Sequence, residues 1–103
     1  MYQKLVRDKI PEIILNNGEQ PIIKILSDEE YKQELERKLN EEYQEVLNSN
    51  GKERIEELAD MLEVMISLAK LENKNLDDII ETAKNKKEKR GGFEKKIYLE
   101  EVQ

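Results

Sequence analysis

Two long stretches with helical periodicity, separated by a short turn, constrain this chain more than any other feature. In residues 27–48 and again in residues 52–72, apolar side chains recur every three or four positions. Between them, residues 48–51 read Asn-Ser-Asn-Gly, a composition typical of turns. Because a short turn makes consecutive amphipathic helices antiparallel neighbours, the sequence predicts a helical hairpin.

Shorter segments flank this hairpin. Pro11 suits the first turn of a helix that ends near Asn17, where Gly18 stops it. A further helix is predicted over residues 76–90 and ends at Gly91-Gly92. The β-branched and apolar runs at 22–26 and 96–99 predict short strands. We therefore expect a mainly α fold, an antiparallel bundle of three to four helices with one or two peripheral strands, in one domain spanning residues 1–103.

The start of the first long helix carries a specific signal. Ser27 followed three residues later by Glu30 is the pattern of a capping box, and Asp28 and Glu29 complement the helix dipole. The predicted helix 52–72 is apolar over most of its circumference, which predicts burial from more than one side. In so short a chain this predicts a partner subunit, in a homodimer or homotetramer.

Composition narrows the chemistry. The 103 residues include neither cysteine nor histidine, so any metal site must use oxygen ligands, which favour hard cations such as Mg²⁺, Mn²⁺ or Ca²⁺. The net charge of −6 argues against a generic binder of nucleic acid polymers. No apolar run approaches the length of a membrane span, and the N-terminus lacks a signal peptide's apolar core. We expect a cytoplasmic protein.

Two acidic motifs carry the strongest functional signal. Glu42 and Glu45 are three residues apart in the first long helix, and Glu57 and Asp60 repeat this spacing in the second. Residues at i and i+3 share a face of a helix, and both pairs border an apolar stripe, where unpaired carboxylates are costly. Four carboxylates facing one space would need a cation, and a divalent metal is the simplest candidate. A solvated acidic face explains the same pattern, and the two explanations balance.

Two basic segments admit a similar pair of interpretations. Lys86, Lys89 and Arg90 precede Gly91-Gly92, where they either compensate the helix dipole or close over an anion such as phosphate. Near the N-terminus, Lys4, Arg7 and Lys9 are either surface charges or a second basic arm at a ligand. The residues after Gly91-Gly92 do not form a P-loop.

Taken in order, these motifs resemble those of the MazG-like all-α nucleoside triphosphate pyrophosphohydrolases, and in layout their phosphoribosyl-ATP pyrophosphohydrolase-like branch. From the first to the last, the matching stretches span nearly the whole chain. They are Lys4 to Pro11, Lys38 to Glu42, Glu56 to Asp60, and Lys89 to Phe93. One departure concerns the eleven residues between Glu45 and Glu57, a gap near or below the short end of the family's usual range.

The resemblance implies a helical core that oligomerises and binds Mg²⁺, with Mn²⁺ as a substitute, through Glu42, Glu45, Glu57 and Asp60. It implies hydrolysis of a ribo- or deoxyribonucleoside triphosphate to the monophosphate and pyrophosphate, with clearance of damaged or surplus nucleotides as a role. In the corresponding mechanism Glu41 is the candidate general base, since no histidine is present. Charge on the phosphates is then stabilised by Lys86, Lys89, Arg90 and Arg7.

Two other functions fit the sequence. Phosphoribosyl-ATP or another pyrophosphate-linked compound is an alternative substrate for the same chemistry. A non-catalytic helical dimerisation or adaptor module, whose acidic clusters only provide solubility, is an alternative of a different class. Nothing in the sequence marks a pocket for a particular base.

Overall fold

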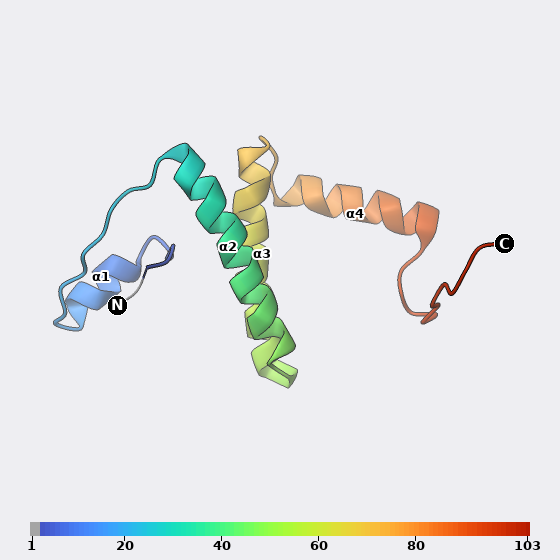
Figure 1. The fold of residues 1–103 in the computed structure, drawn as a ribbon, viewed down its shortest axis with the longest axis horizontal. Helices are drawn as coiled ribbons and strands as arrows, with labels where there is room; N and C mark the ends of the chain where they lie inside the picture. Colours follow the sequence, from blue (N-terminus) through green and yellow to red (C-terminus); the bar gives the residue numbers. More distant parts are fainter. Residues whose placement is uncertain (1–2) are drawn as a thin grey trace.

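Four helices supply the regular structure of residues 3–103, which are the residues that the computed structural model describes (Figure 1). They are α1 (Ile10–Asn16), α2 (Asp28–Leu47), α3 (Gly51–Leu71) and α4 (Leu76–Arg90). Each begins and ends within two residues of the bounds that the sequence predicts. The first two residues of the predicted domain, 1–2, lie outside the described residues.

Local hydrogen bonds explain where the helices begin. The capping box of α2 is confirmed: the Glu30 backbone N–H donates to Ser27 Oγ at 3.2 Å, and the Ser27 backbone N–H donates to Glu30 Oε1 at 3.0 Å. This backbone hydrogen bond is the main cause that lowers the pKa of Glu30, and Lys24 adds to it. A second capping box, which we did not predict, joins Asn75 and Asp78 at the start of α4.

Residues in the left-handed region mark the ends of three helices. Gly18 follows α1 with φ of 81°, and Gly91 follows α4 with φ of 83°, both at predicted stops. Asn73 plays the same part after α3 with φ of 60°. There the Asn73 N–H donates to the Lys70 carbonyl and the Lys74 N–H to the Ala69 carbonyl, each at 3.0 Å, which is the Schellman pattern. The corner between α3 and α4 is therefore a defined structure.

The predicted hairpin is confirmed, because α2 and α3 pack side by side along their lengths (Figure 1). Leu35 of α2 and Val64 of α3 are the buried hydrophobic residues of the described chain, at 3% and 7% exposure. At the turn, buried Ser49 donates from Oγ to the Val46 carbonyl at 3.0 Å, and Arg54 Nε donates to the Ser49 carbonyl at 2.9 Å. These bonds join the two helices at the turn.

The predicted bundle is only partly formed. Helix α4 meets α3 at the corner where the two join and then projects away from the hairpin, while α1 lies on the other side, beyond an extended segment (Figure 1). The Cα radius of gyration is 17.9 Å, whereas a compact domain of this length has about 13 Å. In the described part of the chain, none of the helices combines the length and hydropathy needed to cross a membrane.

The two predicted strands are wrong for the described chain, residues 3–103, which contains no strand. The segments 22–26 and 96–99 are irregular, and side chains such as Ile22 and Tyr98 are exposed. The physical reason is the lack of a partner. The two segments lie at opposite ends of the molecule (Figure 1), and an isolated run with high β-propensity has no edge on which to form a ladder.

The small core predicts where the hairpin is vulnerable. We expect Leu35→Ala to lower the free energy of unfolding by about 3 kcal/mol, because Leu35 is buried between the two long helices. Ile22→Ala is the matched control, since Ile22 is 97% exposed and should change little. Urea titration followed by circular dichroism measures both. Equal effects of the two substitutions would contradict this assignment of the core.

Candidate metal centre

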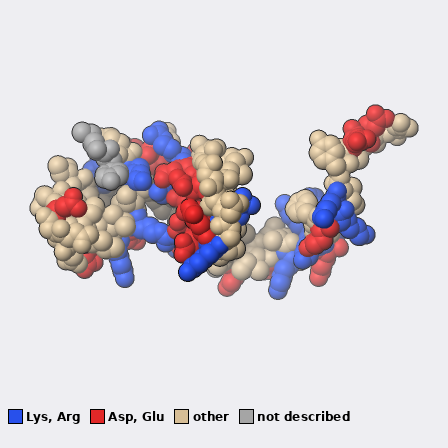
Figure 2. Space-filling view, turned by 90° about the horizontal axis from the view of Figure 1, so that it is seen from below, with Lys and Arg blue, Asp and Glu red and all other residues tan. Residues whose placement is uncertain are grey.

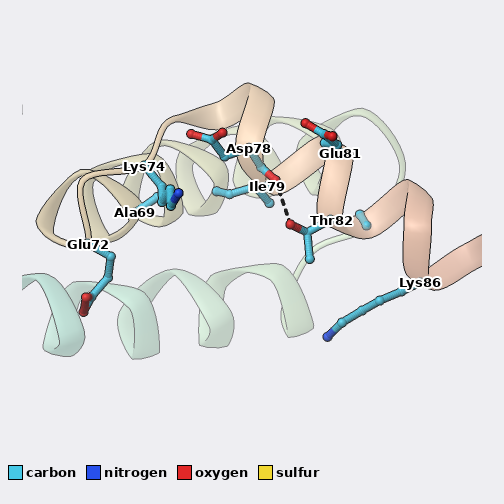
Figure 3. Close-up of a pocket in the computed structure, with 9 residues that line it drawn as sticks. Ala69, Glu72, Lys74, Asp78, Ile79, Glu81, Thr82 and Lys86 are labelled. Atoms are coloured by element: carbon cyan, nitrogen blue, oxygen red, sulfur yellow. Dashed lines mark hydrogen bonds between the residues drawn. The ribbon is translucent and has the colours of Figure 1, made fainter.

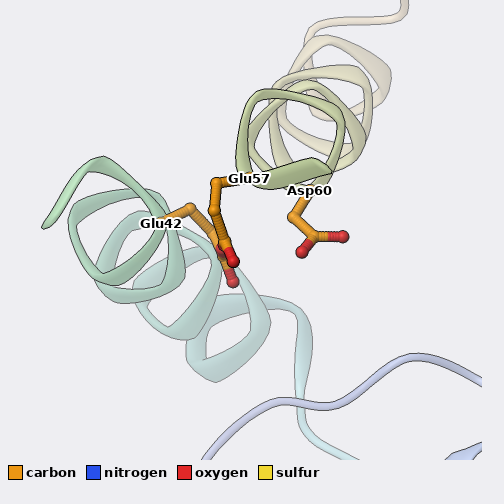
Figure 4. A group of neighbouring side chains, drawn as sticks. All are labelled: Glu42, Glu57 and Asp60. Atoms are coloured by element: carbon orange, nitrogen blue, oxygen red, sulfur yellow. The ribbon is translucent and has the colours of Figure 1, made fainter. Parts of the chain in front are cut away.

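Three carboxylates from the two packed helices converge on one space. Figure 4 shows Glu57 and Asp60 leaving α3 toward the space that Glu42 faces from α2. One oxygen from each carboxylate lies within 4.8 Å of the other two. The i, i+3 spacing on α3 and the antiparallel packing of the hairpin produce this arrangement together. We call these three residues the acidic triad.

The four predicted metal ligands differ in how deeply they are buried. Glu42 is 7% exposed, although it is an ionisable residue, and Glu57 and Asp60 are half-buried. Glu45 is exposed and lies outside the triad. The structure thus brings three of the four predicted ligands together. The fourth is still near enough to act electrostatically on Glu57.

The pKa of Glu57 is raised above its ordinary value of 4.5. Partial burial, which disfavours the charged carboxylate, is the largest cause. The negative charges of Glu45, Asp60, Glu42 and Glu53 add to it in that order. Repulsion among these carboxylates is the electrostatic condition that a bound cation would relieve.

The protein's own cations balance part of this charge. Arg7 Nη2 donates to Asp60 Oδ1 at 2.8 Å, which brings the N-terminal segment to the triad. Lys38 Nζ lies 3.5 Å from a carboxylate oxygen of Glu42 and 3.5 Å from one of Glu41. Arg7, predicted to contact phosphate, therefore pairs with a predicted metal ligand. Lys38 had no predicted role, although its i+3 and i+4 spacing to the two glutamates signals these pairs.

Glu41, the predicted general base, borders the triad without belonging to it. Its carboxylate lies 3.6 Å from Lys4 Nζ and 3.5 Å from Lys38 Nζ. Its side chain is 39% exposed, so water has access to it. The prediction that it accepts a proton stays untested by this geometry.

The predicted phosphate-binding residues on α4 lie away from the triad within one chain. Lys86 and Arg90 line a shallow depression with Gly91, Gly92 and Phe93, and Lys89 belongs to the same helical turns. Figure 2 shows acidic side chains in a band at the centre of the view and basic side chains gathered on α4 at the right. The described chain alone does not bring the two groups together.

A separate groove lies at the corner of α3 and α4. Figure 3 shows Ile79 and Thr82 of α4 beside Ala69 of α3, with Lys86 at one end. Thr82 Oγ1 donates to the Asp78 carbonyl at 2.9 Å, so its polar group is already satisfied within the helix. This groove contains none of the predicted site residues except Lys86.

The acidic triad is a group of carboxylates that could hold a hard divalent cation. Oxygen ligands of Mg²⁺ lie about 2.1 Å from the ion, so two ligands on opposite sides are about 4.2 Å apart. Neighbouring ligands are about 3 Å apart, so the triad's oxygens, which lie within 4.8 Å of one another, would have to draw together around a bound ion. All available ligands are carboxylates, which suit Mg²⁺ or Mn²⁺. The triad would supply at least three protein oxygens to such an ion.

Comparisons with known proteins leave the function of this site open. No family model matches the chain, and no solved structure matches it. A curated protein of Mycolicibacterium smegmatis, described as uncharacterized, is 51% identical over 43 residues. That stretch is 42% of this chain and 44% of the mycobacterial protein, so the match spans less than half of its relative.

The raised pKa of Glu57 predicts how stability depends on pH. Between 4.5 and the raised pKa, the folded state binds more protons than the unfolded state, so stability falls as pH rises through this window. We expect Glu57→Gln to raise the melting temperature in EDTA at pH 7 and to have little effect at pH 4, where Glu57 is protonated in both states.

The control is Glu63→Gln, which removes an exposed carboxylate from the same helix. Thermal unfolding followed by circular dichroism at both pH values compares the two variants with the unmodified chain. A Glu57→Gln variant no more stable than the control at pH 7 would mean that repulsion within the triad is unimportant.

Proposed function

We propose that this protein is a Mg²⁺-dependent nucleotide pyrophosphohydrolase, which cleaves a nucleoside triphosphate to the monophosphate and pyrophosphate. The observation that carries the proposal is the convergence of Glu42, Glu57 and Asp60 from two packed helices, with Glu42 buried. Lys38 is the protein's own cation beside this buried carboxylate, and a divalent cation would compensate the charge of all three carboxylates together. The order of acidic and basic motifs, which resembles the MazG-like pyrophosphohydrolases, supports the same reaction.

In this proposal Glu42, Glu57 and Asp60 would hold the cation, with Glu45 as the fourth ligand. When bound, Mg²⁺ supplies charge neutralisation for the triphosphate oxygens and acidifies a water molecule. The helical hairpin fixes the positions of the carboxylates before substrate arrives. Its contribution to catalysis is then mostly positioning and electrostatics.

Arg7 has a place in this scheme because its ion pair is replaceable. The side chains of Arg7 and Asp60 are 58% and 45% exposed, and ion pairs with this much access to water contribute about 0–1 kcal/mol. Arg7 could give up this pair at little cost if Asp60 held a divalent cation. Arg7 is then free, beside the same carboxylates, to form paired hydrogen bonds with a phosphate group.

Glu41 is the proposed acceptor of the proton that the attacking water loses. It lies next to Glu42 in sequence, and the adjacent Lys4 and Lys38 hold its carboxylate in place. Lys38 also contacts Glu42, so it links the proposed base to the proposed ligand set. We assign Lys38 a positioning role.

A non-catalytic helical dimerisation module is the second candidate. Two observations favour it: Arg7 and Lys38 already balance much of the triad's charge, and many large apolar side chains are exposed. In such a protein the acidic residues provide solubility and the apolar surface provides affinity. The presence or absence of turnover separates the two candidates.

The proposal predicts a specific product pattern. Incubation with Mg²⁺ and a panel of ribo- and deoxyribonucleoside triphosphates should yield the monophosphate and pyrophosphate, separated by chromatography. We expect Glu42→Gln to lower turnover by at least 100-fold, because it removes the buried charge that holds the cation. Glu63→Gln, on the exposed side of α3, should keep full activity.

Melting in the presence of metal gives a second readout. Mg²⁺ at 100 times its dissociation constant should stabilise the unmodified protein by about 2.7 kcal/mol and should leave Glu42→Gln nearly unchanged. Diphosphate and phosphate as products would show that the wrong bond was assigned. A protein that neither turns over nucleotides nor responds to Mg²⁺ or Mn²⁺ would leave the dimerisation module as the better explanation.

A further inference from the structure

The single chain exposes far more surface than its size requires. Its accessible surface is 9667 Å², whereas a compact monomer of this mass exposes about 6,000 Å². A stable dimer buries about 800 Å² from each chain, so the excess is more than sufficient for one. The area alone does not identify the partner, but the distribution of apolar residues and charge does.

Exposed apolar residues gather in residues 13–25 and on two further parts of the chain, which lie in regions of opposite charge. One part is the end of the chain, residues 84–103, which we call the C-terminal arm. After α4 the arm carries Phe93 at 96% exposure and Tyr98 at 87%. The other part is a row on α3, where exposed Ile55, Leu58 and Leu62 share one face at i, i+3 and i+7. Both apolar surfaces are uncovered within one chain, and each could cover the other.

Charge on the same two parts is complementary. Residues 84–96 of the arm include seven basic and two acidic residues, a net charge of +5. Residues 28–63, which form most of the hairpin, include thirteen acidic and five basic residues, a net charge of −8. The arm projects away from its own hairpin, so within one chain these charges do not meet (Figures 1 and 2). A second copy offers the missing hairpin.

We propose that two copies associate so that the C-terminal arm of each lies against the α2–α3 hairpin of the other. The basic end of α4 from one copy then faces the acidic triad of its partner, and the apolar tail covers the row on α3. This inference rests on the proposed function, because it assigns Lys89 and Arg90 to phosphate binding across the interface. It makes the active site a product of both chains.

The dimensions allow one arm to make both contacts. The row on α3 faces away from Glu57 and Asp60, so the arm has to pass around the helix. A helix with its side chains is about 10–12 Å across, and half of its circumference is about 16–19 Å. The eight residues that follow Arg90, up to Tyr98, span up to about 26 Å when extended. Gly91 and Gly92 allow the change of direction where α4 ends.

Cysteine cross-linking tests the arrangement directly, since the chain has no cysteine of its own. Glu45→Cys and Lys89→Cys are prepared separately, mixed and mildly oxidised. We expect a disulfide-linked dimer in which one chain is the Glu45→Cys variant and the other is the Lys89→Cys variant. The control pair is Glu45→Cys with Glu19→Cys, an exposed position outside both the hairpin and the arm, which should cross-link at least ten times less.

The outcome does not depend on catalysis. If no mixed disulfide forms, or if a chain with both cysteines cross-links only within itself, the arm does not reach a second copy and the inference is wrong. If the mixed disulfide forms and the unmodified protein shows no turnover, the interface stands and the proposed function fails. The two failures are therefore distinguishable.

Mixing two inactive variants tests the shared site. Glu42→Gln damages the triad, and the double variant Lys89→Ala, Arg90→Ala damages the arm. After co-refolding, half of the dimers carry one chain of each kind, and one of their two sites combines an intact hairpin with an intact arm. We expect activity to recover to about a quarter of that of the unmodified protein. If the unmodified protein is active and the mixture is not, the arm acts within its own chain.

Discussion

The packing of α2 against α3 is the contact on which the rest of the molecule depends. It buries Leu35 and Val64, and it sets the helices at the distance where Glu42, Glu57 and Asp60 meet. Neither α1 nor α4 joins this packing along its length. Because the same interface provides both the core and the acidic triad, the molecule concentrates stabilising burial and unfavourable charge in one place.

Local signals made the helices predictable, whereas partners at long range were not. The capping box at Ser27 and the stops at Gly18 and Gly91 need only neighbours in sequence, and the structure has all three. The runs at 22–26 and 96–99 failed as strands because a ladder depends on a second edge, which β-propensity does not supply. The prediction that three to four helices pack in one bundle was too extensive for a similar reason. An apolar helix face does not specify whether its own chain or another chain covers it.

In the acidic triad, too, features set by local sequence were predictable and features set by long-range packing were not. The i, i+3 spacing and the short turn were sufficient to place Glu42, Glu57 and Asp60 together. They were insufficient for Glu45, whose position depends on how α2 is rotated against α3. The pairing of Arg7 with Asp60 joins residues 53 positions apart, and no pattern in the sequence indicated it. These ion pairs give the acidic triad a charge balance of its own, which any incoming cation has to replace.

The corner between α3 and α4 has a consequence for how such a chain can vary. Asn73 in the left-handed conformation and the capping box at Asn75 fix the direction in which α4 leaves the hairpin. Each residue added to a helix rotates the next segment of the chain by about 100° and advances it by about 1.5 Å. An insertion of one residue before Asn73 would therefore aim the basic side of α4 elsewhere while leaving every contact of the hairpin intact. Insertions and deletions at this corner should therefore be tolerated less well than substitutions at the exposed positions of α4.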